Sequence, residues 1–284
     1  MRRVVLAGIA VIVAAFAFAA PAGAITNGMP DGNGHPEVGA LLAPQPYSDG
    51  TWATCSGTLI SPTVFLTAAH CDQGVSRVAV TFDSSYNAAT GTTYWGTWHA
   101  DPDYNKAQSD PHDVAVVVLD KPVTGITPAR LPAAGSLSDL KGGTGFTSVG
   151  YGAQSVTIDH GPTFRYSDVR YVATGGLNAL TPSWLRISMN PAHGDGGTCY
   201  GDSGGPNFLG AGTGETDIGR HDDHRRHHVP GDQRRLPDGH GFRAGIPRAV
   251  RHAAISSSAR SQSRAAAAVQ DWLRLPSGTP VIGW

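Results

Sequence analysis

Charged residues are scarce in this sequence, and the two signs nearly balance. Asp, Glu, Lys and Arg make up 15% of the 284 residues, and the formal net charge is −1 at pH 7. A chain with so little excess charge has no electrostatic footprint for nucleic acid or for an anionic membrane surface. We therefore expect no nucleic-acid partner, and no membrane partner for the mature chain.

Long apolar runs are also missing, except for one at the N-terminus. Two arginines precede the apolar run 4–20, and three small residues follow it at 22–24. This order is typical of a secretory signal peptide. The run could also anchor the chain in a bilayer, but the small residues favour cleavage. We predict that residues 1–24 are a signal peptide and that the mature, secreted chain starts at Ile25, outside the cell, where disulfides persist.

Cysteine is rare, and none follows position 199. The three cysteines are Cys55, Cys71 and Cys199. An odd number in a secreted protein means that one thiol is free, is bridged to another molecule, or lacks its partner in this sequence.

Helical patterns are nearly missing between residues 25 and 209. In this stretch, short strand-like runs alternate with many of the 37 glycines and 20 prolines of the sequence. Regularly spaced short strands predict an all-β barrel or sandwich. The Pro-rich segment 122–132 is the expected crossing between two halves. The predicted strands lie in 55–71 (two strands around a Ser-Pro turn), 75–82, 113–120, 146–152, 164–172 and 184–190.

Three motifs carry residues that together suit peptide hydrolysis. "TAAHC" contains His70, "HDVAVVVL" contains Asp113 and "GDSGGP" contains Ser203. This chemistry needs a nucleophile, a base, an acid that orients the base, and donors for the developing oxyanion. Each residue alone has an ordinary structural explanation, but the three motifs together favour a catalytic site. His112, beside Asp113, is expected to be an exposed side chain.

In these motifs the sequence resembles the chymotrypsin/trypsin family of secreted serine proteases. The resemblance covers about residues 25–210 and is most specific around His70 and Ser203; Asp113 stands in Asp-Val-Ala-Val, where the family has Asp-Ile-Ala-Leu. It implies an all-β fold of two six-stranded antiparallel Greek-key β-barrels, over 25–125 and 126–218. It also implies polypeptide substrates and neither a metal nor an organic cofactor. We expect a monomer.

The resemblance implies a role for each motif residue. Ser203 is the nucleophile, His70 the general base and then the acid for the leaving amine, and Asp113 the buried carboxylate that orients His70. The backbone N–H groups of Gly201 and Ser203 form the oxyanion hole, where a residue without Cβ suits the close approach of substrate.

Two further pairings follow from the resemblance. Cys55 and Cys71 are expected to form a disulfide that fixes the turn beside His70. A new amine at Ile25 is expected to pair with Asp202 and organise the oxyanion hole, so that signal cleavage alone creates the active N-terminus. The alternative is that Ile25 only opens a β-strand.

The resemblance also places Gly197, six residues before the nucleophile, at the floor of the substrate pocket. An Asp there would attract Arg or Lys side chains, which glycine cannot do. We expect an apolar rather than a basic preference.

After residue 218 the composition changes, and residues 219–284 are expected to be an irregular tail. Residues 220–252 are rich in Arg, His, Asp, Pro and Gly, with no strand or helix pattern. The family has strands, a cysteine partner for Cys199 and a terminal helix there, so the second barrel is expected to be incomplete. The tail could be a divergent sequence. Alternatively, four of its histidines could bind a metal from one face of a helix, although Pro230 opposes a helix there. These histidines are His221, His224, His227 and His228.

A one-nucleotide frameshift near Gly219 is a third explanation. In the +1 frame every His or Asp codon becomes a codon for Thr, Ile or Met, which favours strands. With G or C at most third positions, 219–247 permits "VATMTTGDTTCRATNVAYRMDTASARAFL", which contains a cysteine to match Cys199.

The sequence therefore predicts a secreted serine endopeptidase. It also predicts that the chain with the present residues after 218 folds poorly or is inactive. The rival is a secreted non-catalytic binding protein on the same scaffold, which requires the displacement of at least one of His70, Asp113 and Ser203.

Overall fold

The structure is a computed structural model, and it describes residue 25 and residues 27–105, 112–132, 137–158, 162–181, 185–211 and 218–221. The predicted signal peptide, 1–24, and all but three residues of the predicted tail, 219–284, lie outside the described residues. Within the described residues, no helix is long and apolar enough to cross a membrane.

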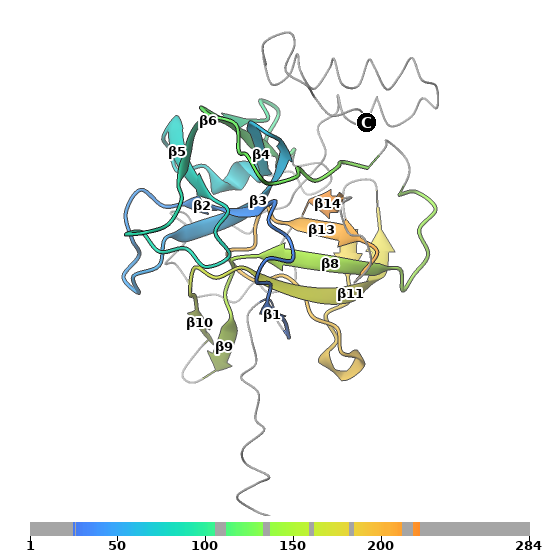
Figure 1. Ribbon diagram of the computed structural model, residues 1–284. Coiled ribbons are helices and arrows are strands. Elements are labelled where there is room, and N and C mark those ends of the chain that lie inside the picture. The colour runs from blue at the N-terminus through green and yellow to red at the C-terminus, as the bar shows by residue number, and fades with distance from the viewer. Residues whose placement is uncertain are drawn as a thin grey trace, which may run out of the picture.

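The first half of the chain closes into a barrel of six antiparallel strands (Figure 1). Successive side chains point to opposite faces of a strand, so that one face of each strand fills the barrel interior. That interior contains Leu41, Leu59, Phe65 and Val117, each fully buried. The strands close in the order β2-β3-β4-β7-β6-β5 and are β2 (Val38–Leu42), β3 (Ala53–Ser61), β4 (Val64–Thr67), β5 (Arg77–Thr81), β6 (Tyr94–Ala100) and β7 (Ala115–Leu119).

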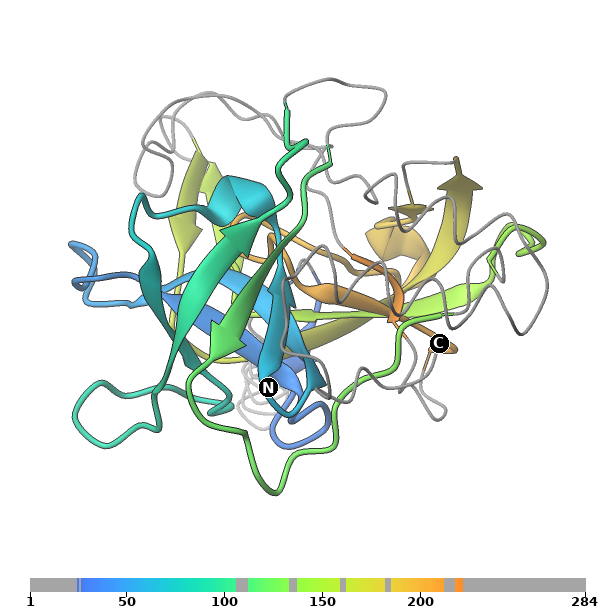
Figure 2. The same cartoon turned by 90° about the horizontal axis from the view of Figure 1, so that it is seen from above.

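The second half forms a six-stranded sheet beside the barrel, as the view from above shows (Figure 2). Its path is β1-β11-β8-β13-β14, and β12 pairs with β11. A separate hairpin joins β9 (Ser155–Ile158) to β10 (Pro162–Arg165). The strands of the sheet are β1 (Met29–Pro30), β8 (Gly145–Gly150), β11 (Tyr171–Leu180), β12 (Leu185–Ile187), β13 (Pro206–Leu209) and β14 (Ile218–His221).

The predicted all-β, chymotrypsin-like architecture is confirmed, with two differences in detail. The second unit is an open sheet over the residues described, whereas the barrel in the first half is closed. The sequence predicts no strand in 220–252, but β14 continues to His221 and pairs with β13 through Pro206↔His221. Strand pairing needs only backbone donors and acceptors, so β14 forms without an alternating side-chain pattern.

The predicted strand 164–172 is wrong, because Asp168 interrupts it. β10 ends at Arg165 and β11 starts at Tyr171. Asp168 has a φ of 53°, in the left-handed region that strands do not use. Its carboxylate accepts hydrogen bonds from the N–H groups of Trp52 and Ala53, at 2.8–2.9 Å, and so fastens this loop to the barrel.

A buried charge pair connects the N-terminal segment to both halves. Arg170 has 1% of its surface exposed, and its Nε donates to Asp31 Oδ2 at 2.7 Å. Asp31 also accepts from His35, whose ring stacks on Phe208 of β13. The remaining guanidinium donors bond to oxygens of the N-terminal segment, the barrel and the second half, namely those of Gly32, Val38, Phe82 and Tyr151.

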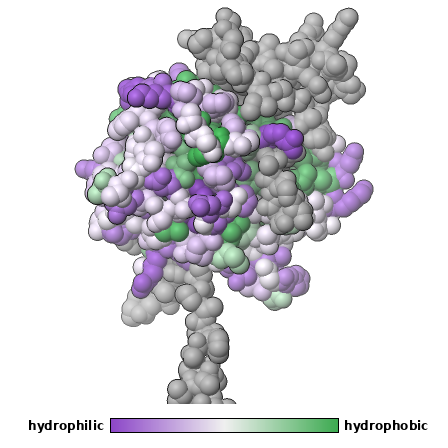
Figure 3. Space-filling model, in the orientation of Figure 1, coloured by the Kyte–Doolittle hydropathy of each residue, from purple (hydrophilic) through white to green (hydrophobic). Residues whose placement is uncertain are grey.

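Large hydrophobic side chains on the described surface are few and lie on separate elements. Met29 is in the second sheet, whereas Val75 and Trp95 are in the first half, with exposures of 67%, 42% and 52%. On the face drawn in Figure 3, hydrophobic residues form small areas among hydrophilic ones. Isolated apolar side chains of this kind are ordinary for a protein surface.

We predict that Asp31→Asn lowers the free energy of unfolding by about 3–5 kcal/mol at pH 7, because the Arg170 charge stays buried without its carboxylate. Burial alone would raise the pKa of Asp31, but the hydrogen bonds and charges of His35 and Arg170 lower it below the ordinary value of 3.8. The contribution of the ionised group is therefore present above pH 3.8 and is lost as pH falls through the lowered pKa.

The difference in the free energy of unfolding between wild type and Asp31→Asn should therefore become smaller in acid. Urea unfolding at pH 7 and at successively lower pH measures this difference. The control is Asp120→Asn, since Asp120 pairs with Arg77 on the surface, where ion pairs contribute little. Equal losses for Asp31→Asn and Asp120→Asn at pH 7 would contradict the prediction.

Candidate active site

The register of β4 and β7 brings His70 and Asp113 to one end of the barrel. His70 lies in the short 3₁₀ turn η2 (Ala69–Cys71) just after β4, and Asp113 lies just before β7. The strands are antiparallel, with Thr67 opposite Ala115. Because the end of one strand meets the start of the other, the two residues are neighbours although 43 positions apart in sequence.

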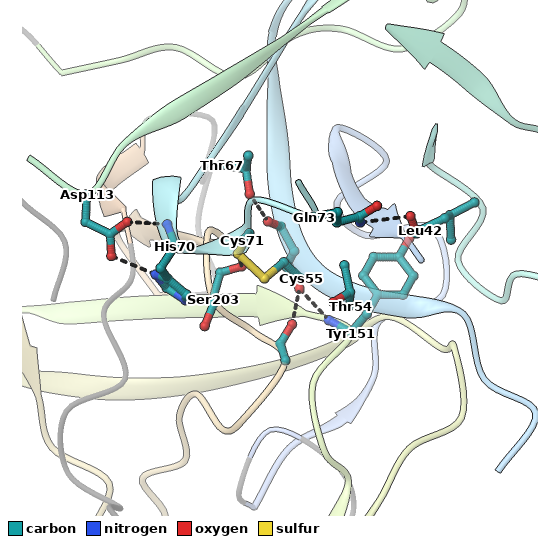
Figure 4. Close-up of a disulfide and its surroundings, with 12 residues drawn as sticks. Leu42, Thr54, Cys55, Thr67, His70, Cys71, Gln73, Asp113, Tyr151 and Ser203 are labelled. Atoms are coloured by element: carbon teal, nitrogen blue, oxygen red, sulfur yellow. Dashed lines mark hydrogen bonds and ion pairs between the residues drawn. A yellow bond between two sulfur atoms is a disulfide. The ribbon is translucent and has the colours of Figure 1, made fainter. Parts of the chain in front are cut away.

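The Asp113 carboxylate makes two hydrogen bonds to His70. Its Oδ1 accepts from the His70 backbone N–H at 2.8 Å, and its Oδ2 lies 2.7 Å from His70 Nδ1 (Figure 4). The side chains of Asp113 and His70 are 1% and 7% exposed. A buried carboxylate at Nδ1 favours the tautomer in which Nδ1 carries the proton and Nε2 can accept one.

Tyr104 is a further ionisable group near the Asp113 carboxylate. Burial raises the pKa of the Tyr104 hydroxyl, and the charge of Asp113 raises it further. Burial and the Asp113 charge thus both disfavour ionisation of this phenol.

Ser203 comes from the second half and reaches the same place. Its carbonyl oxygen accepts from the Ser56 N–H at 2.8 Å and lies 3.9 Å from the sulfur of Cys71, the residue after His70. Figure 4 draws the Ser203 side chain beside the His70 imidazole. The structure thus brings together the three side chains that the motifs suggested: His70, Asp113 and Ser203.

Ser56 of β3 is a contributor that sequence reasoning missed. Its hydroxyl donates to the Gly201 carbonyl at 3.2 Å and accepts from the Tyr151 N–H at 2.9 Å. Its own carbonyl accepts from Thr67 Oγ1 at 2.8 Å. The barrel and the nucleophile turn are joined through this residue, which no sequence motif identified.

The nucleophile turn needs glycine at two positions. Gly201 and Gly204 have φ values of 93° and 83°, in the region that favours residues without Cβ. A Cβ on Gly204 would lie 2.4 Å from the backbone oxygen of Ser56 and 2.3 Å from Thr67 Oγ1. The turn is therefore pressed directly against the barrel.

Asp202 lies in the nucleophile turn, between Gly201 and Ser203, and is completely buried. Its Oδ1 accepts from the Gly152 N–H at 2.6 Å and its Oδ2 from the Cys199 N–H at 2.8 Å. Ile25, its expected N-terminal partner, is also completely buried. In the full chain the Ile25 nitrogen belongs to a peptide bond, so the ion pair stays a prediction for the cleaved chain.

Cys55 and Cys71 form the disulfide that the resemblance implied, with an S–S distance of 2.01 Å. It joins β3 to η2, the turn that contains His70. Cys199 is buried in a different place, packed with Ala153 and Phe164.

The environment of Gly197 is apolar on the side where a side chain would project. A Cβ built on Gly197 would lie 2.6 Å from both Cγ and Sδ of Met189. Any residue larger than glycine must displace Met189.

The expectation that His112 is exposed is wrong. His112 is 8% exposed and has a φ of 52°, and its Nδ1 lies 3.5 Å from Asp101 Oδ2. The two residues are 11 positions apart, and the pairing of β6 with β7 (Ala100↔Ala115) brings them together. Only the strand register, which was not predicted, could have indicated the contact.

The chain is also similar in sequence to known proteins. The family model described as Trypsin matches residues 43–229, more than half of the chain. The chain is similar to brachyurin of Leptuca pugilator, with 33% identity over 175 residues that cover 58% of this chain and 75% of that protein.

Two other relatives are similar over nearly the same share of this chain. Trypsin delta of Drosophila melanogaster is 26% identical over 163 residues, covering 54% of this chain and 63% of that protein. Chymotrypsin of Phaedon cochleariae is 28% identical over 165 residues, covering 54% of this chain and 58% of that protein.

We predict that Gly204→Ala lowers the free energy of unfolding by at least about 2 kcal/mol, because it combines an unfavourable φ with overlap against the barrel backbone. Gly74→Ala is the matched control, since Gly74 has a φ of 71° but nothing within 4 Å of a built Cβ. It should cost only about 1 kcal/mol, the strain of the left-handed conformation alone. Urea unfolding measures both, and equal losses would mean that the backbone contact contributes nothing.

Proposed function

Because the chain belongs to the trypsin family of serine proteases, we propose that it is an endopeptidase that cleaves polypeptides through an acyl-enzyme on Ser203. The proposal rests chiefly on the buried Asp113 carboxylate, which holds both the backbone and the ring of His70 next to Ser203.

In the proposed reaction His70 Nε2 takes the proton of the Ser203 hydroxyl as the oxygen attacks the scissile carbonyl. Asp113 keeps Nδ1 protonated and stabilises the imidazolium that results. The new oxyanion is held by the N–H groups of Gly201 and Ser203, and His70 then gives its proton to the leaving amine. A water molecule, deprotonated by His70, then attacks the acyl-enzyme ester, and His70 returns the proton to the Ser203 oxygen as it leaves. These steps use side chains and backbone groups alone.

The proposal divides the mature chain into halves 25–125 and 126–218, with substrate bound between them. His70 and Asp113 come from the first half and Ser203 from the second, which supports this division. The contact of Met189 with Gly197 supports an apolar rather than a basic preference.

The proposed enzyme is secreted, and removal of residues 1–24 makes its active N-terminus. The complete burial of both Ile25 and Asp202 supports a buried amine–carboxylate pair in the cleaved chain. N-terminal sequencing of secreted protein should therefore begin at Ile25. A start several residues to either side would contradict this part of the proposal, because the new amine would not reach Asp202.

The chain as written is proposed to be poorly active, owing to a frameshift near Gly219. The end of the Trypsin match at residue 229 supports this. Loss of the family's remaining strands would leave the second sheet with less core and an exposed edge.

We predict that a fluorophosphonate labels a frame-restored version of the chain rapidly and the chain as written far more slowly. Ser203→Ala should abolish labelling, and His70→Ala should slow it by at least about 10³-fold, since the hydroxyl loses its base. Mass spectrometry of the labelled protein measures the rate and locates the adduct.

Each remaining outcome decides between alternatives. Rapid labelling of the chain as written would refute its proposed inactivity. Labelling of neither version would favour a non-catalytic binding protein on this scaffold. For the frame-restored version, faster cleavage of arginyl than of leucyl reporter peptides would refute the apolar preference.

A further inference from the structure

A second cluster of ionisable side chains lies at the end of β6, beside the segment that presents Asp113. One potential ligand atom from each of Asp101, Asp103 and His112 lies within 4.8 Å of the other two. The only other such group in the described part of the chain consists of His70 with Cys55 and Cys71. Those two sulfurs are joined to each other, so they are not available as thiolate ligands.

Backbone hydrogen bonds hold the cluster in place. The Asp101 N–H donates to the Val114 carbonyl at 2.9 Å, and the Val114 N–H donates to the His112 carbonyl at 2.8 Å. The Asp103 N–H donates to Asp101 Oδ1 at 2.9 Å. Val114, the residue before β7, thus fixes Asp101 and His112, and Asp101 fixes Asp103.

The second carboxylate oxygen of Asp101 is buried and has no hydrogen-bond donor among the described residues. The Asp101 side chain is 2% exposed, and its Oδ2 is directed towards His112 Nδ1 at 3.5 Å. At 3.5 Å this ion pair is longer than a hydrogen bond, so it compensates only in part for the hydration that the buried carboxylate oxygen has lost. A cation placed between these two atoms would supply a closer partner for the carboxylate.

We propose that Asp101, Asp103 and His112 bind a Zn²⁺ ion. Zinc accepts imidazole and carboxylate ligands at about 2.0–2.2 Å in a tetrahedron, which separates neighbouring ligand atoms by roughly 3.4 Å. The 3.5 Å between Asp101 Oδ2 and His112 Nδ1 fits one edge of such a tetrahedron. Calcium is disfavoured, since it takes six to eight oxygen ligands.

Access to the site is provided by Asp103, which is exposed, whereas the other two ligands are buried. Its side chain can swing onto the ion from solvent, and water completes the fourth position. The ion would fasten the end of β6 to His112, the residue before Asp113, and so stiffen the segment that orients His70. The site does not depend on the proposed reaction, because none of its ligands contacts the reacting atoms.

The test is titration of the full-length protein with Co²⁺, a spectroscopic substitute for zinc. His221, His224, His227 and His228 are first replaced by Asn, because histidines near the C-terminus could bind the same ions. We expect one Co²⁺ per chain, with the intense visible bands of a tetrahedral site, displaced by Zn²⁺ and not by Ca²⁺.

Removing one ligand should weaken Co²⁺ binding by at least about 10-fold. Loss of a group that only supports a metal ligand already costs about that much in metal affinity. The variants are Asp101→Asn, Asp103→Asn and His112→Gln; Asp103 is exposed, so its change should leave the fold intact, as circular dichroism can verify. The matched control is Asp120→Asn, which removes a surface carboxylate elsewhere on the barrel. Failure to bind Co²⁺, or equal binding by control and ligand variants, would overturn the proposal.

Discussion

The two hydrogen bonds from His70 to the Asp113 carboxylate are the constraint on which the site depends. They join the end of β4 to the start of β7, and neither strand alone could present a base in a fixed orientation. Their strength comes from burial, because a low-dielectric surrounding raises the value of a charged hydrogen bond. The barrel therefore serves as a rigid frame for one imidazole ring.

The second half must reach that ring, and two buried groups provide the connection. Ser56 links β3 to the turn that contains Ser203, while Arg170 links the N-terminal segment, the barrel and the second half. Neither Ser56 nor Arg170 belongs to β14, the last strand of the described sheet. A change to the chain after β14 therefore leaves both of these connections between the halves in place.

Much of the site could be predicted from sequence, because short motifs carried its chemistry. The motifs around His70 and Ser203 indicated both the residues and the architecture, and short alternating runs located most of the barrel. Asp168 could not be predicted, since its left-handed conformation depends on the N–H groups of Trp52 and Ala53, which are distant in sequence. The burial of His112 likewise depends on the register of β6 against β7.

The disulfide between Cys55 and Cys71 has a consequence for where the chain can mature. It closes a loop with a sequence separation of 16 residues, and such a crosslink contributes about 3 kcal/mol by restricting the unfolded chain. In a reducing cytoplasm the η2 turn would lose that tether while the barrel was still assembling. Production of this protein in bacteria would therefore favour export to the periplasm, or oxidative refolding, over accumulation inside the cell.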